Sequence, residues 1–264
     1  MIKLLKGDCL ELMKDIPNGS IDMILADLPY GTTACKWDTI IPFEPLWMQY
    51  KRIIKDNGAI VLTASQPFTS ALVMSNIKMF KYEWIWDKVV GANFMNLKNQ
   101  PFKVHENILI FSKSANFAFN PIRINRTSES LKRDPVGKSR IISQKNRKDK
   151  AEHYNNKPIN DIILNKDGLK HPISIIKFSK IAKIKRYNSP NKHPTQKPTI
   201  LFEYLIKTYT NEGDMVLDNV MGSCTTGIAC LILKRNFIGM ELNDKYFEIA
   251  EKRIEEHQRQ LTMF

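Results

Sequence analysis

The most constraining feature of the sequence is a short apolar run, 21–26, that ends directly in an acidic loop. Asp22 is its only polar residue, as expected for a strand that is covered on both of its faces. Asp27 follows at the carboxyl end of the run, and Pro29 restricts the backbone beside it. Doubly covered strands are typical of parallel sheets, in which ligands bind at the carboxyl ends of the strands. The run therefore predicts an α/β fold with a functional site at Asp27.

The loop 27–30, Asp-Leu-Pro-Tyr, carries groups that an attacking nucleobase amine needs. The lone pair of such an amine is delocalised into the ring, so acceptors must hold its hydrogens and draw the nitrogen out of conjugation. Asp27 and the carbonyl oxygen of Leu28 are two such acceptors, and Tyr30 offers a ring on which an unpaired base can stack. The alternative interpretation is an ordinary turn after a strand, because Asp, Pro and Gly are frequent in turns.

A second stretch, 214–229, predicts a strand, a tight loop and an apolar helix. Gly222 in the loop lets the backbone approach a ligand closely. Glu241 ends the next apolar run, 23 residues after Asp218, which is near the spacing of the ribose-binding acid in dinucleotide-binding folds. The loop alone would fit a plain α/β turn equally well, but together with Glu241 it indicates a nucleoside cofactor.

Positive charge is concentrated in one segment of the chain. Residues 112–197 contain 21 Lys and Arg but only 6 Asp and Glu, whereas the remainder of the chain has a net charge of −2. The net charge of +13 therefore arises entirely from this segment. A short charge run is most often a solvated face, but a basic block of this length indicates a surface that contacts nucleic-acid phosphates.

The cysteines and the apolar runs limit the location and the cofactors. The sequence contains four cysteines, Cys9, Cys35, Cys224 and Cys230. They form no C-x-x-C pair and no cluster with the spacing of metal ligands. We therefore expect reduced thiols in a cytoplasm and no metal. No run approaches the ~18 apolar residues of a membrane span, and the amino-terminal run is too short for a secretion signal. A chain of 264 residues allows one large domain with an insertion.

Three motifs resemble those of S-adenosylmethionine-dependent DNA amino-methyltransferases. Residues 27–30 resemble the family's D-P-P-Y signature, with Leu28 in place of the first Pro. Residues 218–226 resemble its cofactor motif D-P-F-x-G-S-G-T-T, and the departures are Asn219, Val220 and Cys224. His-Pro-Thr-Gln-Lys-Pro at 193–198 is the form of the motif that flanks the cofactor. Since the catalytic loop precedes the cofactor loop, the chain resembles the circularly permuted β class.

This resemblance implies a Rossmann-like methyltransferase fold. We expect a mostly parallel seven-stranded sheet with one antiparallel strand near the edge and helices on both faces. Residues 1–112 would form the catalytic half, 113–190 an inserted basic target-recognition region that is partly disordered without DNA, and 191–264 the cofactor-binding half. We expect Cys224 to lie where the loop passes the methionine end of the cofactor and, because Cys is small, to be accommodated there without loss of cofactor binding. The 80–88 and 105–112 runs are expected to pair antiparallel, with Trp84 and Trp86 in the core.

The resemblance also assigns candidate residues. The catalytic candidates are Asp27, Leu28, Pro29 and Tyr30. The cofactor candidates are Asp8, Cys9, Asp27, Lys197, Asp218, Val220, Gly222, Ser223, Thr225, Thr226 and Glu241. The DNA-contacting candidates are Arg123, Arg126, Arg133, Arg140, Arg147 and Arg186. Asp8 is open to a second interpretation, since it could simply cap the helix that follows it.

The implied reaction is transfer of a methyl group from S-adenosylmethionine to N6 of an adenine that is flipped out of duplex DNA. N4 of cytosine is the alternative target, although cytosine-N4 members of the family more often carry Ser at the position of Asp27. An RNA methyltransferase and a non-catalytic DNA-binding regulator that retains the fold are two further alternatives. A homodimer and a companion restriction endonuclease are expected by resemblance only.

Overall fold

The computed structural model describes residues 1–33, 35, 38–91, 97–133, 135–137, 139–141, 162–164, 167–179 and 196–262. Two compact units are formed, one by residues 1–120 with 173–264 and one by residues 121–172. The predicted target-recognition region, 113–190, contains the second unit and extends beyond it on both sides. Its assignment to DNA recognition stays a prediction.

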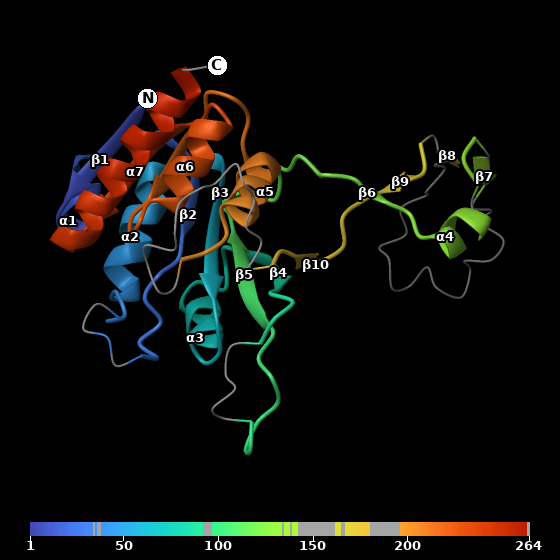
Figure 1. Ribbon diagram of the computed structural model, residues 1–264, viewed down its shortest axis with the longest axis horizontal. Helices are drawn as coiled ribbons and strands as arrows, with labels where there is room; N and C mark the ends of the chain where they lie inside the picture. Colours follow the sequence, from blue (N-terminus) through green and yellow to red (C-terminus); the bar gives the residue numbers. More distant parts are fainter. Residues whose placement is uncertain are drawn as a thin grey trace. The chain divides into compact units, whose positions relative to one another are not determined.

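The large unit is built on one mixed sheet with the strand order β1-β12-β11-β2-β3-β5-β4-β10 (Figure 1). The strands are β1 Ile2–Lys6, β2 Ile21–Ala26, β3 Ile54–Ala64, β4 Phe80–Asp87, β5 His105–Phe111, β10 Ile175–Lys177, β11 Met215–Asp218 and β12 Asn236–Glu241. The pairs from β1 through β3 are all parallel. The predicted mostly parallel α/β fold is therefore confirmed.

Two features of the sheet differ in detail from the expectation. The antiparallel strand is β5, which lies between β3 and β4 and pairs with both of them. An eighth strand, β10, adds parallel to β4, where Ile176 is buried beside Trp86. This strand was not expected, because its three residues lie in a basic segment whose sequence shows no alternation long enough to indicate a strand.

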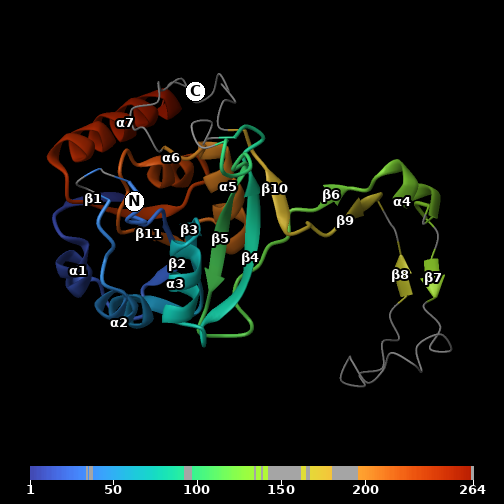
Figure 2. The ribbon, with the colours of Figure 1, turned by 90° about the horizontal axis from the view of Figure 1, so that it is seen from below.

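Helices cover both faces of the sheet (Figure 2). One face carries α1 Cys9–Leu12, the 3₁₀ helix η1 Met13–Asp15, α2 Phe43–Ile53 and α3 Phe68–Ser75. The other face carries α5 Thr199–Tyr209, α6 Thr225–Ile232 and α7 Asp244–Thr262. Alternate residues of a strand point to opposite faces of the sheet and so belong to different cores. Ile24 belongs to the core of the first face and Leu25 to that of the second. Both Trp84 and Trp86 are buried in the core of the second face, as predicted.

The topology brings the predicted site residues to one edge of the sheet. Asp218 and Glu241 end the neighbouring strands β11 and β12, and Asp27 directly follows β2 on the other side of β11. The chain continues from β11 toward β12 but from β2 toward β3, so the winding direction reverses between β11 and β2. Ligands of open α/β sheets bind outside the carboxyl ends of strands at such a reversal.

The smaller unit contains two short antiparallel ladders and one helix. Strand β6 Ile124–Asn125 pairs with β9 Leu169–Lys170, and β7 Ser139–Ile141 pairs with β8 Ile162–Leu164. Helix α4 Ser128–Arg133 carries no buried residue. Among all the residues that the structure describes, no helix is long and apolar enough to cross a membrane. The same residues contain no group of His, Cys, Asp and Glu with a metal-binding arrangement.

Tyr50 of α2 ties the first helical layer to the loop after β11, and its removal tests this link. Its buried hydroxyl donates to Oδ1 of the buried Asn219 at 2.6 Å. Tyr50→Phe should lower the free energy of unfolding by about 1–3 kcal/mol, because the Asn219 oxygen loses its donor. Urea denaturation measures the change. The control is Tyr204→Phe, a half-buried tyrosine on the other face, for which a change above about 0.5 kcal/mol would contradict the account.

Candidate active site

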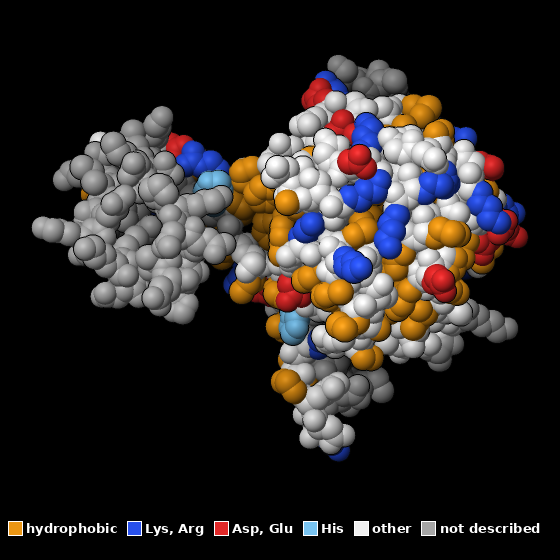
Figure 3. Space-filling view, turned by 180° about the vertical axis from the view of Figure 1, so that it is seen from behind, with side chains coloured by type: hydrophobic (Ala, Val, Ile, Leu, Met, Phe, Trp, Pro, Cys, Tyr) orange, Lys and Arg blue, Asp and Glu red, His pale blue; other side chains and the backbone are white. Residues whose placement is uncertain are grey.

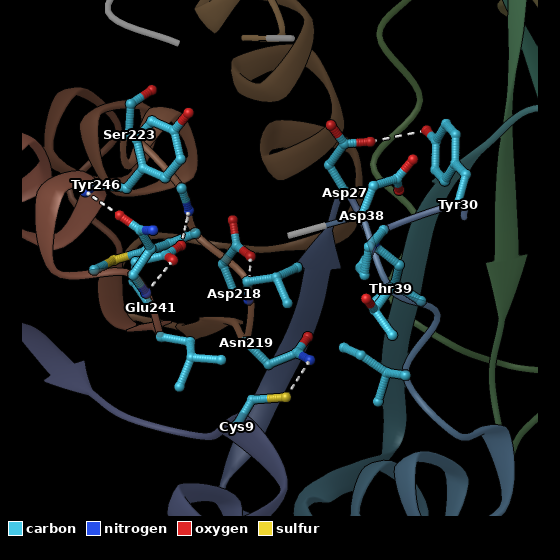
Figure 4. Close-up of a pocket in the computed structure, with 18 of the residues that line it drawn as sticks. Cys9, Asp27, Tyr30, Asp38, Thr39, Asp218, Asn219, Ser223, Glu241 and Tyr246 are labelled. Carbon is cyan, nitrogen blue, oxygen red and sulfur yellow. Dashed lines mark hydrogen bonds between the residues drawn. The ribbon is translucent and has the colours of Figure 1, made fainter. Parts of the chain in front are cut away.

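A single cavity of about 810 Å³ collects the predicted residues of both halves (Figure 4). It lies over the carboxyl ends of the parallel strands. In the view of Figure 4, Asp218, Ser223 and Glu241 lie on one side and Asp27 and Tyr30 on the other. Every candidate catalytic and cofactor residue named from the sequence is among its lining residues. Its volume is in the range of roughly 300–1,000 Å³ that ligand pockets occupy.

Asp27 is the most heavily engaged side chain in the cavity. Its two carboxylate oxygens receive the Lys197 ammonium at 2.8 and 2.7 Å. The Tyr30 hydroxyl donates to Oδ1 at 2.8 Å, and the Thr63 hydroxyl donates to the same oxygen. Burial raises the pKa of Asp27, but the Lys197 ammonium and the hydroxyl donors outweigh burial and hold the pKa below its usual range. Asp27 is therefore a carboxylate at neutral pH.

Lys197 lies in the catalytic half of the cavity and bridges two acids. Besides Asp27, its ammonium is 3.3 Å from Oε2 of Glu106 at the start of β5. Burial lowers the pKa of Lys197, but the neighbouring carboxylates of Asp27 and Glu106 raise it well above its usual range. The sequence motif placed Lys197 beside the cofactor, whereas its ion pairs in the structure are with Asp27 and Glu106.

Tyr30 presents its ring to the cavity. Phe68 of α3 stacks on it at 5.2 Å between ring centroids, with 25° between the planes. The Lys197 ammonium is 5.6 Å from the centroid of the Tyr30 ring. The ring is thus fixed by a hydrogen bond at its hydroxyl and by an aromatic neighbour, as a stacking surface requires.

The loop after Asp27 is held by a carboxylate that the sequence did not single out. Asp38 accepts the backbone N–H groups of Gly31 at 2.9 Å, Thr32 at 2.9 Å and Thr33 at 2.7 Å. Leu28, which replaces the proline of the motif, is 3% exposed and packs into the core under α2 and α3. Its side chain therefore anchors the loop, while its position in the cavity wall leaves the backbone available to a ligand.

The cofactor loop is organised by two acids. Asp218 accepts the hydroxyl of Thr226 and the backbone N–H of Val220. Glu241 accepts the N–H of Gly222 at 3.0 Å and that of Asn243 at 2.8 Å. Because the lining on this side is acidic, it suits a cationic ligand. Burial raises the pKa of Asp218 to about 7, although the hydrogen bonds from Thr226 and Val220 lower it.

Gly222 leaves room for a ligand against the backbone. Its φ is +52°, and a Cβ added there would meet no atom within 4 Å. Asp8, in the short turn between β1 and α1, accepts the N–H of Leu10 at 2.8 Å and caps α1, while it also lines the cavity. The capping interpretation of Asp8 is therefore correct and is compatible with a role toward a ligand.

Cys224 corrects one expectation from the sequence. It does not belong to the cavity wall but is fully buried in the core beneath α5, α6 and α7. Its backbone is left-handed, with φ 64° and ψ 42°, and this directs the side chain away from the ligand side of the loop. The substitution of Cys for Gly therefore leaves the cavity open.

Arg253 supports the same loop from behind and was missed in the sequence. It is 1% exposed, and Nη1 donates to the carbonyl oxygen of Ser223 and, at 3.0 Å, to its Oγ. In the sequence, the spacing of Arg253 from Ala250 and His257 places it on the apolar face of α7. This spacing is the signal from which its burial could have been predicted. Thr63 and Glu106 gave no such signal, because each lies at the end of an apolar run where polar residues are common.

The arginine candidates for DNA contact belong to the basic segment. Arg123 forms a bidentate ion pair with Asp167, and Arg126 donates to the carbonyl of Leu169 at 3.3 Å, so both also brace their own unit. Arg133 is exposed on α4. The side chains of Arg140, Arg147 and Arg186 lie outside the described residues. On the face of the large unit in Figure 3, basic side chains lie scattered among acidic and apolar ones.

The raised pKa of Asp218 gives a pH-dependent stability. The native carboxyl holds its proton up to about pH 7, whereas the unfolded one releases it near 3.8, so stability falls as pH rises between these values. Asp218→Asn does not titrate. Its free energy of unfolding, relative to the natural chain, should therefore rise by roughly 2–3 kcal/mol from pH 5 to pH 7.5. Urea denaturation across pH measures the difference.

The control for this measurement is Asp56→Asn. The carboxylate of Asp56 is 95% exposed, so this variant removes a solvent-facing carboxyl instead of a buried one and should not reproduce the effect of Asp218→Asn. A constant difference for Asp218→Asn would contradict the assigned pKa.

Comparisons with known proteins identify the family. The DNA methylase family (N6 and N4 type) matches residues 21–252. DNA adenine methyltransferase YhdJ of Escherichia coli (strain K12) is 28% identical over 96% of this chain and 82% of its own length. Type II methyltransferase M.HpaI of Haemophilus parainfluenzae is 27% identical over 96% of this chain and 74% of its own length.

Solved structures agree in fold. The M1.HpyAVI–SAM complex has a TM-score of 0.59 at 24% identity and covers 96% of this chain and 99% of its own. The cytosine-N4-specific PvuII DNA methyltransferase has a TM-score of 0.62 at 16% identity and covers 99% of this chain and 93% of its own. The family profile, which spans most of the chain, confirms the relationship that the motifs at 27–30 and 218–226 indicated. The chain therefore belongs to the DNA methylase family.

Proposed function

We propose that the protein transfers a methyl group from S-adenosylmethionine to N6 of an adenine in duplex DNA. The observation that carries the proposal is the cavity itself, which joins an acidic loop of the cofactor type to the Asp27–Tyr30 loop. Adenine is favoured over cytosine by Asp27 and by the similarity to a relative that is named an adenine methyltransferase.

The residues present fit the cofactor. The open space at Gly222 gives a ligand direct access to the loop backbone, and the carboxylates around it suit a cationic sulfonium. Asp8, Asp218, Val220, Gly222 and Glu241 would hold it, and Cys9, Ser223, Thr225 and Thr226 complete the wall. When bound, S-adenosylmethionine supplies an activated methyl donor.

The chain's own residues bind and orient the base. Tyr30, backed by Phe68, provides the surface on which the extruded adenine stacks. The Asp27 carboxylate and the Leu28 carbonyl accept the two hydrogens of N6 and draw its lone pair out of the ring, while Pro29 fixes their separation. Because the pKa of Asp27 is held low, it acts as an acceptor and need not be a strong base. N6 becomes acidic only as it gains the methyl group, and the Asp27 carboxylate then accepts the proton that N6 releases. Holding the reactants in contact supplies much of the acceleration.

The remaining expectations belong to the same proposal. The basic segment would bind duplex DNA, through Arg123, Arg126, Arg133, Arg140, Arg147 and Arg186 among others. A homodimer, a companion restriction endonuclease and a cytoplasmic location stay expectations; the similarity to bacterial type II methyltransferases supports the last two.

Methyl transfer from labelled S-adenosylmethionine to mixed-sequence duplex DNA, with nucleoside analysis of the product, tests the proposal. The natural chain should form N6-methyladenine. Asp27→Asn should lower the rate by about 10²-fold or more, because the amide cannot accept from N6 as a charged carboxylate does. Asp56→Asn, at the exposed start of β3, should retain the full rate. N4-methylcytosine would contradict the choice of base, and failure of transfer on every DNA would contradict the reaction.

Glu241 tests the cofactor assignment separately. Glu241→Gln should weaken binding of S-adenosylmethionine by about tenfold or more in calorimetry, because a charged acceptor is lost. The exposed Glu251→Gln on α7 is the matched control and should bind normally. Equal affinity of the two variants would remove Glu241 from the cofactor site.

A further inference from the structure

The Lys197 ammonium occupies the place that the proposed reaction gives to the target amine. It lies 2.8 and 2.7 Å from the two Asp27 oxygens and 5.6 Å from the centroid of the Tyr30 ring. We propose that Lys197 stands in for the amine until a base arrives, and that Glu106 is a positioning residue that then takes over the ammonium. This inference rests on the proposed function.

Glu106 is already placed to receive the ammonium. Its Oε2 is buried, accepts no hydrogen bond from the described residues and is 3.3 Å from Nζ of Lys197. Its Oε1 pairs with the Lys88 ammonium at 3.1 Å, which fixes the carboxylate from the other side. Both partners are nearly sealed from solvent, with Lys88 3% and Glu106 8% exposed. A small rotation of the flexible lysine stem therefore transfers Lys197 from one carboxylate to the other.

The balance of charge explains why the second acid is required. Asp27, Glu106, Lys88 and Lys197 form a cluster with two charges of each sign. A neutral amine that binds Asp27 leaves this balance unchanged, provided that Lys197 stays in contact with Glu106. Without Glu106, the displaced ammonium would be a buried cation with no partner, which is strongly unfavourable. The base would then compete with Lys197 at a disadvantage.

The exchange also adds selectivity. Asp27 gives up two charge-assisted contacts with Lys197, and only a base that donates hydrogens in return compensates for them. A base without an exocyclic amine, such as thymine, leaves Lys197 in place. If such a base displaced Lys197, the Asp27 carboxylate would be left unpaired. Sites that hydrogen-bond their substrate reject analogues lacking the donor for this reason.

Steady-state kinetics on mixed-sequence duplex DNA test the inference. Glu106→Gln should raise KM for DNA by about tenfold or more and lower kcat by a smaller factor, because Asp27 is free in a smaller fraction of molecules. Glu83→Gln on the neighbouring strand β4, whose exposed carboxylate accepts from Asn107, is the matched control and should change neither constant. In a Lys197→Met background, Glu106→Gln should no longer alter KM, since no ammonium remains to be moved.

A second variant covers the case in which Glu106→Gln fails to fold. Lys88→Met combined with Glu106→Gln removes one charge of each sign, leaves Asp27 paired with Lys197 and should raise KM similarly. An unchanged KM in the Glu106 variants, or an equal rise with and without Lys197, would overturn the inference while methylation by the natural chain continues. Absence of methylation by the natural chain would instead contradict the proposed function and this inference with it.

Discussion

The ion pair between Asp27 and Lys197 is the interaction on which the rest of the site depends. It joins residues 170 positions apart, one after β2 and one before α5, and so connects the two halves of the permuted chain. It also holds Asp27 ionised in a partly buried place where burial alone would favour a neutral acid. Tyr30, Thr63 and Glu106 are all arranged around this pair.

The sheet topology explains why the pair can form beside a cofactor loop. Strands β12, β11 and β2 are parallel neighbours, so Glu241, Asp218 and Asp27 emerge at one edge in that order. The antiparallel β5 runs the other way and begins at this edge, and it therefore brings Glu106 to the same cavity. An acidic cofactor side and a charge-balanced catalytic side follow directly from this arrangement of strand ends.

Sequence reasoning predicted the parts of the structure that depend on local pattern. Buried runs such as 21–26 and the loops that end them were sufficient to place Asp27, Asp218 and Glu241. It could not give the partner of Lys197, because that contact depends on how distant strands are ordered. Strand β10 was missed because a three-residue edge strand has no readable period. The core position of Cys224 depends on one left-handed φ, which composition does not reveal.

The most direct test of the central claim, that Asp27 and Tyr30 receive the target base, is a crystal structure with duplex DNA and S-adenosylhomocysteine. The account predicts an extruded adenine on the Tyr30 ring, with N6 within hydrogen-bond distance of Asp27 and the Lys197 ammonium on Glu106. An extruded base bound elsewhere, with Lys197 still paired to Asp27, would contradict it.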